Sequence, residues 1–389
     1  MTAPIAPCVC GIGFSAIRRM MLMAKDYEDV VTLGIGEPDM HTPEHVVRAA
    51  LADALAGWTH YAHSQGDPEL RQAISERLAA AGRHVAPERI QITAGGMGAL
   101  TAALRTLLCQ GDEVIVPEPH FPDYAAHAGF AGGRLVAVPA HFEDEFVVRP
   151  EAIEAAITDR TRVILLNSPC NPTGAVIPAD VLEAIADIAC RHDLFVISDE
   201  VYDSLSFDGP APGILEQPGM AERTLVVNSF SKTFAMTGWR VGYAYGPEWF
   251  MREMIKVVSY TTASTSTPGQ RAALAALRGP MEPFAAMVEA FARRSAYVYS
   301  RVAAMPGLRV NRPRGTFYLF VDVLGIGMDG LAFAEELLRA EQVVVIPGRT
   351  FGPSCAGFVR LACTVPMDRL EIAMDRLERF VSRQTGTRR

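Results

Sequence analysis

The region between about residue 44 and residue 246 alternates helical patterns with short apolar runs, and this alternation constrains the fold more than any other feature. The apolar runs end at turn residues, which is typical of strands. Several runs are apolar on both alternating faces, as expected for a mostly parallel sheet that is covered by helices. The region therefore predicts an open α/β sheet. The predicted strands cover residues 89–93, 113–117, 134–139, 162–167, 194–198, 224–229 and 240–246.

The pattern changes after residue 246, where long helical stretches are followed by short strands that alternate with helices. We expect helices over residues 248–260, 282–305, 331–340 and 367–382, and strands over 317–322, 343–346 and 357–361. The predicted fold class is α/β, with a three-layer αβα large domain around a mostly parallel sheet and a smaller α+β domain. The predicted domains are residues 1–43 (N-terminal arm and part of the small domain), 44–285 (large domain) and 286–389 (small C-terminal domain).

The charge balance indicates which binding partners to expect, and the lengths of the apolar runs indicate whether the protein enters a membrane. Lys+Arg number 36 against 44 Asp+Glu, which gives a net charge of −8. Because proteins that bind a phosphate backbone usually carry the opposite bias, we expect no nucleic-acid partner. No apolar run approaches the ~20 residues that span a bilayer. Arg18 and Arg19 interrupt the N-terminal apolar run, unlike in a signal peptide, so we expect a cytoplasmic protein without a membrane partner.

The seven cysteines are scattered along the chain and form no C-x-x-C pair. An odd number at such spacing is typical of reduced thiols that pack inside a protein. Cys8 and Cys10 stand one residue apart, but two such thiols do not make a metal site by themselves. We therefore predict no metal, and the role of these two cysteines stays open.

The stretch "SFSKTFAMTGWRVGYA" (229–244) carries very little charge for its length. Lys232 has Ser229 and Ser231 beside it, and no further charge follows until Arg240. A surface face would scatter charges of both signs, so this stretch indicates residues built around a bound group.

Other polar residues follow the predicted strands, where open α/β sheets place their ligands. "LLNSPCNPTG" offers Asn171 at a strand end, and "LFVISDEVYDSL" ends a strand on Asp199 with Tyr202 three residues later. A carboxylate at such depth is unfavourable unless a cation or donor meets it. "TAGGMGALTAAL" (93–104) places three glycines where a strand becomes a helix, which exposes backbone N–H groups to an anion.

Together these residues describe one ligand. It has an anionic end for the glycine turn, the serines and Arg240, and a cationic group for Asp199. It also has a polar oxygen for Asn171 and Tyr202, while Lys232 supplies a reactive amine. Pyridoxal 5′-phosphate has this set of features: a phosphate, a pyridine nitrogen, a phenolic oxygen and an aldehyde that forms a Schiff base with lysine.

On these motifs the chain resembles the class I/II pyridoxal-phosphate-dependent aminotransferases, which have the aspartate aminotransferase fold. The resemblance covers nearly the whole chain, because the family's motifs occur in the family's order. These motifs are "LGIGEPDMHTPEHV", "YAHSQGDPELR", "GGMGAL", "NSPCNPTG", "DEVYDSLSF", "SFSKTFAMTGWRVGY", "PRGTFYLF" and "FVRLA".

The resemblance implies a role for each catalytic residue. Lys232 matches the Schiff-base lysine that moves the substrate proton. Asp199 matches the aspartate that keeps the pyridine nitrogen protonated. Tyr202 and Asn171 match the partners of the ring oxygen.

For the rest of the cofactor site, the resemblance implies a phosphate cup of Ser229, Ser231, Arg240 and the Gly96–Met97 backbone. Tyr61 matches a tyrosine that reaches the phosphate from a neighbouring subunit, so a homodimer with shared active sites is implied.

For the substrate side, Arg360 matches the arginine that clamps the α-carboxylate, with help from Gly36 and Asn171. Phe121 falls where the family places an aromatic ring over the cofactor. The implied function is a ping-pong transfer of an amino group from an L-amino acid to a 2-oxo acid, with 2-oxoglutarate as the expected acceptor. Some relatives that use aspartate carry a lysine in the glycine turn, where this chain has Met97. We therefore favour an aromatic or broad-range donor, with aspartate still possible.

Two alternatives remain open from the sequence. A C–S β-lyase or another pyridoxal-phosphate lyase or synthase on this fold would use nearly the same lysine, aspartate and arginine. A pyridoxal-phosphate-binding regulatory module would usually carry a DNA-binding extension at its N-terminus, whereas the resemblance here begins by about residue 12.

Overall fold

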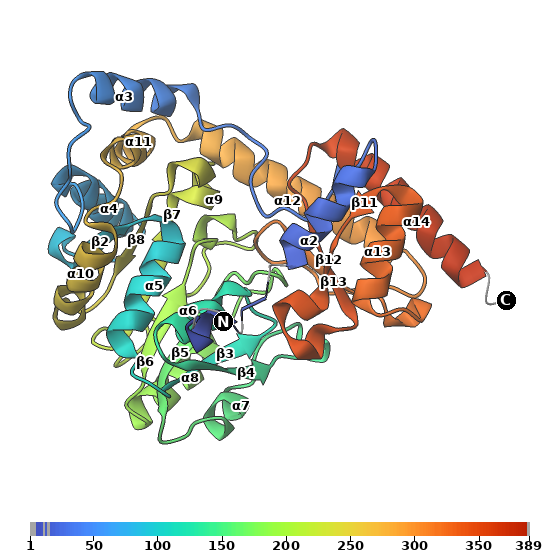
Figure 1. The fold of residues 1–389 in the computed structure, drawn as a ribbon, viewed down its shortest axis with the longest axis horizontal. Coiled ribbons are helices and arrows are strands. Elements are labelled where there is room, and N and C mark those ends of the chain that lie inside the picture. The colour runs from blue at the N-terminus through green and yellow to red at the C-terminus, as the bar shows by residue number, and fades with distance from the viewer. Residues whose placement is uncertain (1–4, 11, 14–15, 387–389) are drawn as a thin grey trace.

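The structure is a computed structural model that describes residues 5–10, 12–13 and 16–386. Its larger sheet has seven strands in the order β2-β8-β7-β6-β5-β3-β4 (Figure 1). All neighbours are parallel except β8, which runs antiparallel to both β2 and β7. The strands are β2 Ile90–Thr93, β3 Glu113–Glu118, β4 Arg134–Pro139, β5 Thr161–Asn167, β6 Phe195–Asp199, β7 Thr224–Ser229 and β8 Gly242–Tyr245.

The predicted strands of this sheet are confirmed, with one shortened. The apolar run 240–246 forms a strand only from Gly242, because Arg240 turns the chain with a left-handed φ of 56°. Such a conformation interrupts the extended backbone that a strand needs.

Helices cover both faces of the sheet, which confirms the three-layer αβα arrangement. Side chains of β6 alternate between the two sides: Phe195 and Ile197 join one core cluster, and Val196 joins another. This explains why the strands are apolar on both faces. One face packs against α5 (Gly95–Leu107), α6 (Asp123–Phe130) and α10 (Glu248–Thr262). The other packs against α4 (Pro68–Ala80), α7 (Pro150–Ala155), α8 (Ala179–Arg191) and α11 (Thr267–Arg278).

A second, four-stranded antiparallel sheet has the order β12-β13-β10-β9. Its strands are β9 Arg309–Val310, β10 Tyr318–Asp322, β12 Ile346–Pro347 and β13 Phe358–Ala362. The predicted strand 343–346 is divided, because β11 (Val343–Val344) pairs with β1 (Val31–Thr32) and only the residues after it join β13. This pairing ties the N-terminal segment to the C-terminal part of the chain. The helices of this part are α12 Glu282–Ala303, α13 Gly330–Glu341 and α14 Met367–Gly386.

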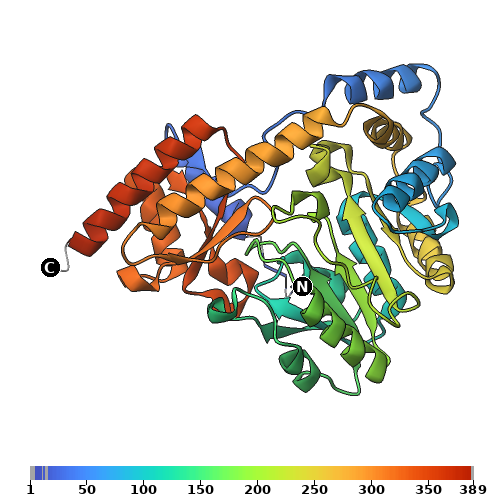
Figure 2. The same ribbon diagram turned by 180° about the vertical axis from the view of Figure 1, so that it is seen from behind.

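Helix α12 runs from the region of the large sheet to the C-terminal sheet (Figures 1 and 2). It crosses the predicted domain boundary at 285/286. Phe284 belongs to a core cluster of the large sheet, whereas Met287 belongs to the core of the C-terminal part. The domain limits at 43/44 and 285/286 stay predictions. The remaining helices are α1 Pro7–Cys10, α2 Ala16–Met23, α3 Glu44–Leu55 and α9 Phe230–Thr233.

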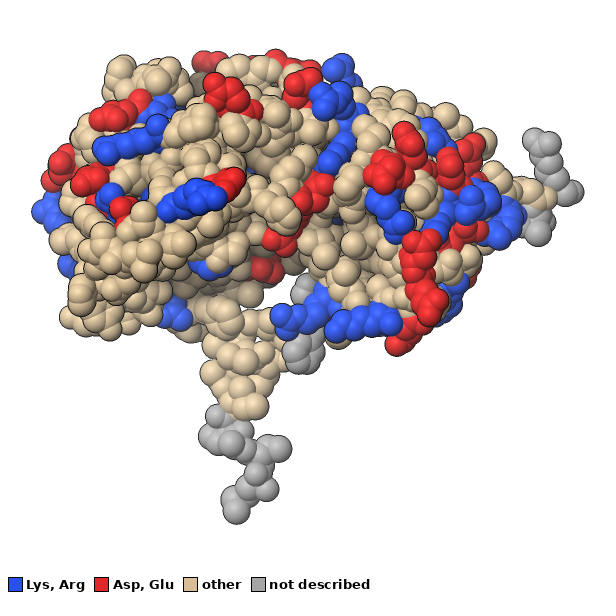
Figure 3. All heavy atoms as spheres, turned by 90° about the horizontal axis from the view of Figure 1, so that it is seen from above, with Lys and Arg blue, Asp and Glu red and all other residues tan. Residues whose placement is uncertain are grey.

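Acidic and basic side chains are interspersed on the face that Figure 3 displays. Within the described ranges, no helix combines the length and the apolar character that a bilayer crossing requires.

The parallel strands β5, β6 and β7 end at the same edge of the large sheet, so the loops that follow them meet there.

Candidate active site

A cavity of about 380 Å³ lies at this edge. It gathers residues from the large sheet, from the N-terminal segment and from the C-terminal sheet. Every site residue predicted from the sequence lines it, except Tyr61. These lining residues are Gly36, Gly96, Met97, Phe121, Asn171, Asp199, Tyr202, Ser229, Ser231, Lys232, Arg240 and Arg360.

Lys232 is held in the short helix α9, directly after β7. Ser229 caps this helix, because its Oγ accepts a hydrogen bond from the Ser231 amide at 3.2 Å. The Lys232 Nζ donates to the Gly36 carbonyl oxygen at 2.6 Å. Burial lowers the pKa of Lys232 to about 8, and nearby Arg360 and Arg240 act in the same direction while Glu37 opposes them. A minor fraction of this amine is therefore neutral at pH 7, and this fraction grows as the pH approaches 8.

Asp199 ends β6 and is almost fully buried, with 4% of its surface exposed. The Tyr124 hydroxyl donates to its Oδ2 at 2.6 Å, and the Val201 amide donates to Oδ1 at 3.3 Å. Burial raises the pKa of Asp199 to about 6, against these two hydrogen bonds. Within the described part of the chain no cation pairs with this carboxylate, so the site can accept a cationic group.

Arg360 lies in the centre of β13 and is 1% exposed. Its Nη1 donates to Asn171 Oδ1 at 3.0 Å, and its Nη2 donates to the Gly34 carbonyl oxygen at 2.8 Å. The guanidinium lies 4.4 Å from the centre of the Tyr318 ring. Its Nε has no hydrogen-bond partner, and no carboxylate of the described residues pairs with it. A buried cation without an anion is a ready site for a carboxylate.

A third group of residues forms an anion site at the start of α5. Gly95 has a φ of 69°, and a Cβ there would come within 2.9 Å of Arg240 Nη2, so glycine is required. The residue before the helix, Ala94, offers no side-chain cap to the first amides. These amides, the hydroxyls of Ser229 and Ser231 and the Arg240 guanidinium all lie around the same cavity.

Several functional residues were missed by sequence reasoning. Tyr124 holds Asp199, and Tyr318 shares a 3.0 Å hydrogen bond between its hydroxyl and that of Tyr202. Tyr318 also explains why residue 36 is a glycine, since a Cβ at that position would lie 1.9 Å from the Tyr318 hydroxyl oxygen. Tyr124 could have been found as the polar residue three positions after Phe121, and their rings meet edge to face at 5.6 Å.

Tyr61 does not reach this cavity within its own chain. It is 91% exposed and lines a separate surface pocket. Its predicted contact with the phosphate therefore requires a second copy of the chain.

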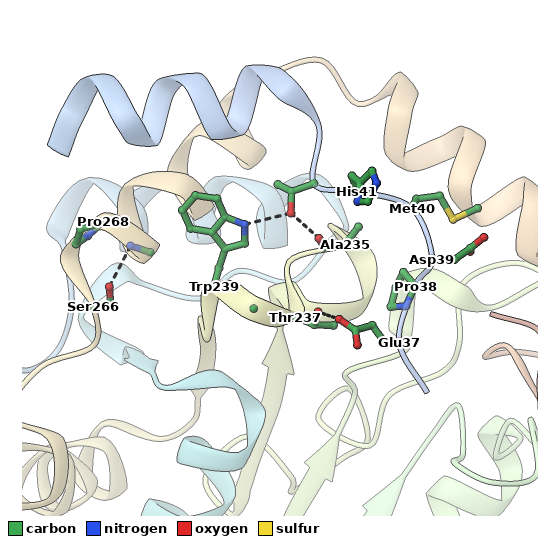
Figure 4. A pocket seen from close by; sticks show the side chains of 13 residues that line it. Glu37, Pro38, Asp39, Met40, His41, Ala235, Thr237, Trp239, Ser266 and Pro268 are labelled. Atoms are coloured by element: carbon green, nitrogen blue, oxygen red, sulfur yellow. Dashed lines mark hydrogen bonds between the residues drawn. The ribbon is translucent and has the colours of Figure 1, made fainter. Parts of the chain in front are cut away.

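A neighbouring pocket of about 580 Å³ lies beside the cavity, and Glu37 and Thr237 line both (Figure 4). Hydrogen bonds hold its wall, one of them from the Thr237 hydroxyl to the Glu37 carboxylate. The Trp239 Nε1 donates to Thr42 Oγ1 at 3.1 Å, and Thr42 Oγ1 donates to the Ala235 carbonyl oxygen at 2.6 Å (Figure 4). This pocket brings together no set of reactive groups comparable to Lys232, Asp199 and Arg360.

The donor set fits pyridoxal phosphate and one carboxylate substrate. Asp199 lacks a cation, Arg360 lacks an anion and has a free Nε, and the glycine turn faces the cavity without a side-chain cap. Lys232 adds a partly buried amine to the same cavity. No group of three or more His, Cys, Asp or Glu side chains is placed to hold a metal within the described ranges.

Comparison with known proteins agrees with this geometry. The family model for aminotransferase class I and II matches residues 28–377. An aspartate aminotransferase of Pyrococcus abyssi is 40% identical over 372 residues, covering 94% of this chain and 95% of that protein. An arginine–pyruvate transaminase of Pseudomonas aeruginosa is 41% identical over 360 residues and 92% of each chain.

An aromatic-amino-acid aminotransferase of Thermococcus litoralis is 39% identical, covering 94% of this chain and 95% of that protein. The solved structure of Thermus thermophilus aspartate aminotransferase with maleate superposes with a TM-score of 0.91 at 39% identity, covering 97% of this chain and 100% of that one. The resemblance and the fold class predicted from the motifs are confirmed, and the names of these relatives do not favour the lyase alternative. With the family match and the cavity in agreement, the chain belongs to the aminotransferase class I and II family and is a pyridoxal-phosphate-dependent transaminase acting on amino-acid and 2-oxo-acid substrates.

Proposed function

We propose that the reaction takes place in the cavity around Lys232 and follows a ping-pong order. The amino donor would leave as a 2-oxo acid before the acceptor binds. The observation that carries this proposal is the convergence of Lys232, Asp199 and Arg360 in one cavity, where none of the three neutralises another. When bound, pyridoxal phosphate supplies an aldehyde for the amine and a pyridine ring that accepts electrons from the Cα–H bond.

Arg360 would bind the α-carboxylate of both substrates. Its guanidinium is held in place by Asn171, by the Gly34 carbonyl and by the Tyr318 ring, which fixes the direction in which its free Nε points. A planar guanidinium binds a carboxylate with two parallel hydrogen bonds, which sets the orientation of the substrate. This would place the substrate Cα within reach of Lys232.

Lys232 would act as the base that takes the proton from Cα at its Nζ and later returns it. A lysine with a pKa of about 8 keeps a usable neutral fraction and still holds a proton well, which is the compromise general base catalysis needs. The Gly36 carbonyl oxygen orients the amine.

Asp199 would keep the ring nitrogen protonated, and Tyr124 would hold its carboxylate in place. Tyr202 and Asn171 would hold the ring oxygen, and Phe121 would cover the ring face. Ser229, Ser231, Arg240 and the backbone of Gly96 and Met97 would bind the phosphate. The site lies at the helix α5 terminus, where the first amides favour an anion.

We propose an aromatic or broad-range donor. Met97 lines the cavity, and no lysine stands in the glycine turn to bind a second carboxylate. The apolar side chains of Ile17, Ile35 and Leu100 also line the cavity and would accept an apolar substrate chain. The named relatives act on aspartate, aromatic amino acids and arginine, so their names leave the choice of donor open. 2-Oxoglutarate is the first acceptor to test.

We also propose a homodimer in which Tyr61 of one chain completes the phosphate site of the other. Large apolar side chains of α3, which precedes Tyr61 in the chain, are exposed on a single chain, among them Leu51 at 59% and Leu55 at 82%. Contact with a second copy would cover them.

Replacement of Lys232 should abolish both covalent attachment and turnover. The chain contains only three lysines, and Lys25 and Lys256 are exposed. Borohydride reduction of the wild-type holoenzyme, followed by peptide mass spectrometry, should mark Lys232 alone. Lys232→Ala should lose this mark, and its rate of donor conversion should fall by at least about 10³-fold, because the base is gone. Lys256→Ala is the control and should retain both properties; a marked peptide without Lys232 would contradict the assignment.

The buried carboxylate of Asp199 should destabilise the cofactor-free protein above its pKa. The folded-state pKa of about 6 exceeds the ordinary 3.8. Below about pH 4 the carboxyl is protonated in both the folded and the unfolded protein and does not change the free energy of unfolding. Above pH 6 it is charged in both states, and its burial then lowers the free energy of unfolding by the full amount. Asp199→Asn should therefore be more stable than wild type at pH 8, by up to about 3 kcal/mol, and equal to it near pH 4. Urea denaturation of both cofactor-free proteins checks this. A variant that is less stable than wild type at pH 8 would show that the charge carries no such cost.

Tyr61→Phe should weaken cofactor retention without changing the assembly. Loss of one hydrogen bond to a charged phosphate should raise the dissociation constant of pyridoxal phosphate about tenfold. Sedimentation equilibrium should give twice the 42.1 kDa chain mass for both proteins. Tyr299→Phe, in α12, is the control and should bind the cofactor normally. A monomeric wild-type protein with full cofactor affinity would refute the shared site.

A further inference from the structure

One carboxylate among the charged side chains that line the cavity has no assigned role in binding the cofactor or the substrate. Six charged residues line it. On the proposed function, Lys232 is used by the aldehyde, Arg240 by the phosphate, Arg360 by the substrate α-carboxylate and Asp199 by the ring nitrogen. Glu37 is engaged by the Thr237 hydroxyl. The sixth is the carboxylate of Asp123.

Asp123 is the first residue of α6 and is partly buried. Burial alone raises the pKa of its carboxyl, and no hydrogen bond or ion pair from the described residues reaches its side chain. Its neighbours in sequence are engaged: Phe121 lines the same cavity and Tyr124 holds Asp199. A partly desolvated carboxylate beside a substrate cavity is unfavourable until a cation or a donor meets it.

The depth of Asp123 separates it from the groups that hold the cofactor. Asp199 and Arg360 are 4% and 1% exposed, so solvent barely reaches them. Asp123 is more exposed than either and is therefore the more accessible carboxylate to a group that enters from solvent. The substrate α-carboxylate is proposed to sit at Arg360, so the substrate side chain is the part that can extend toward a shallower residue.

We propose that Asp123 binds the cationic end of a basic amino-acid side chain, so that amino donors such as arginine and lysine are preferred over dicarboxylic ones. This inference rests on the proposed function and deepens it. The apolar cavity residues Ile17, Ile35 and Leu100 suit the aliphatic stem of such a side chain, and the carboxylate suits its charged end. The same charge works against a second carboxylate on the amino donor.

The test compares amino donors in the donor half-reaction of the holoenzyme, followed by cofactor absorbance. Wild type should convert L-arginine and L-lysine with a kcat/KM at least about tenfold above that for L-glutamate. Asp123→Asn should lower kcat/KM for the two basic donors about tenfold while L-phenylalanine changes less than about twofold. Asp123→Lys should reverse the order in favour of L-glutamate.

A first-turn aspartate also stabilises its helix through the dipole, so a matched control is needed. Asp180 is an exposed first-turn residue of α8 outside the cavity, and Asp180→Asn should leave all donor ratios unchanged. Calorimetric binding of 5-guanidinopentanoate, which is arginine without its α-amino group, gives a readout without turnover. Its dissociation constant should rise about tenfold in Asp123→Asn, whereas that of hexanoate should not.

Unchanged donor ratios and unchanged 5-guanidinopentanoate binding in Asp123→Asn would overturn the inference. Failure of the proposed function would look different, because no donor, L-phenylalanine included, would then convert the bound cofactor to its amine form. The binding of 5-guanidinopentanoate would still report on Asp123 in that case.

Discussion

The buried guanidinium of Arg360 is the interaction on which the rest of this site depends. It lies in the middle of a strand of the C-terminal sheet, 1% exposed, over the Tyr318 ring. Its hydrogen bonds to Asn171 and to the Gly34 carbonyl link three parts of the chain that are far apart in sequence. Burying a cation without an anionic partner is unfavourable by several kcal/mol. Because the described part of the fold provides no such partner, a substrate carboxylate that binds to Arg360 removes part of this unfavourable free energy.

The same principle applies to the other charges of the cavity. Asp199 lacks a cation and Lys232 lies in surroundings that disfavour its charge. Two buried charges and the partly buried Lys232, which do not neutralise one another, make the cofactor-free cavity electrostatically unfavourable. Binding of a phosphate, a ring nitrogen and a carboxylate supplies the missing partners together, which links cofactor binding, substrate orientation and stability in one arrangement.

Much of this arrangement could be predicted from the sequence, because its parts are local. The strands of the large sheet were found from apolar runs, and Lys232, Asp199, Asn171 and Arg240 stand in short motifs at strand ends. Tyr124 and Tyr318 could not be assigned in this way. Each acts on a residue that is 75 or 116 positions away, and such contacts are set by tertiary packing. The division of strand 343–346 between two sheets likewise depends on pairing with β1 and β13.

We infer that the fold itself, before any ligand binds, lowers the pKa of Lys232 far enough that a usable fraction of its amine is neutral near neutral pH. Competitive labelling of the cofactor-free protein with acetic anhydride, read by mass spectrometry as a function of pH, tests this directly. The exposed Lys25 and Lys256 serve as internal references for the reagent. We predict that Lys232 titrates with a pKa of about 8. Titration at its ordinary value of 10.5 would contradict it.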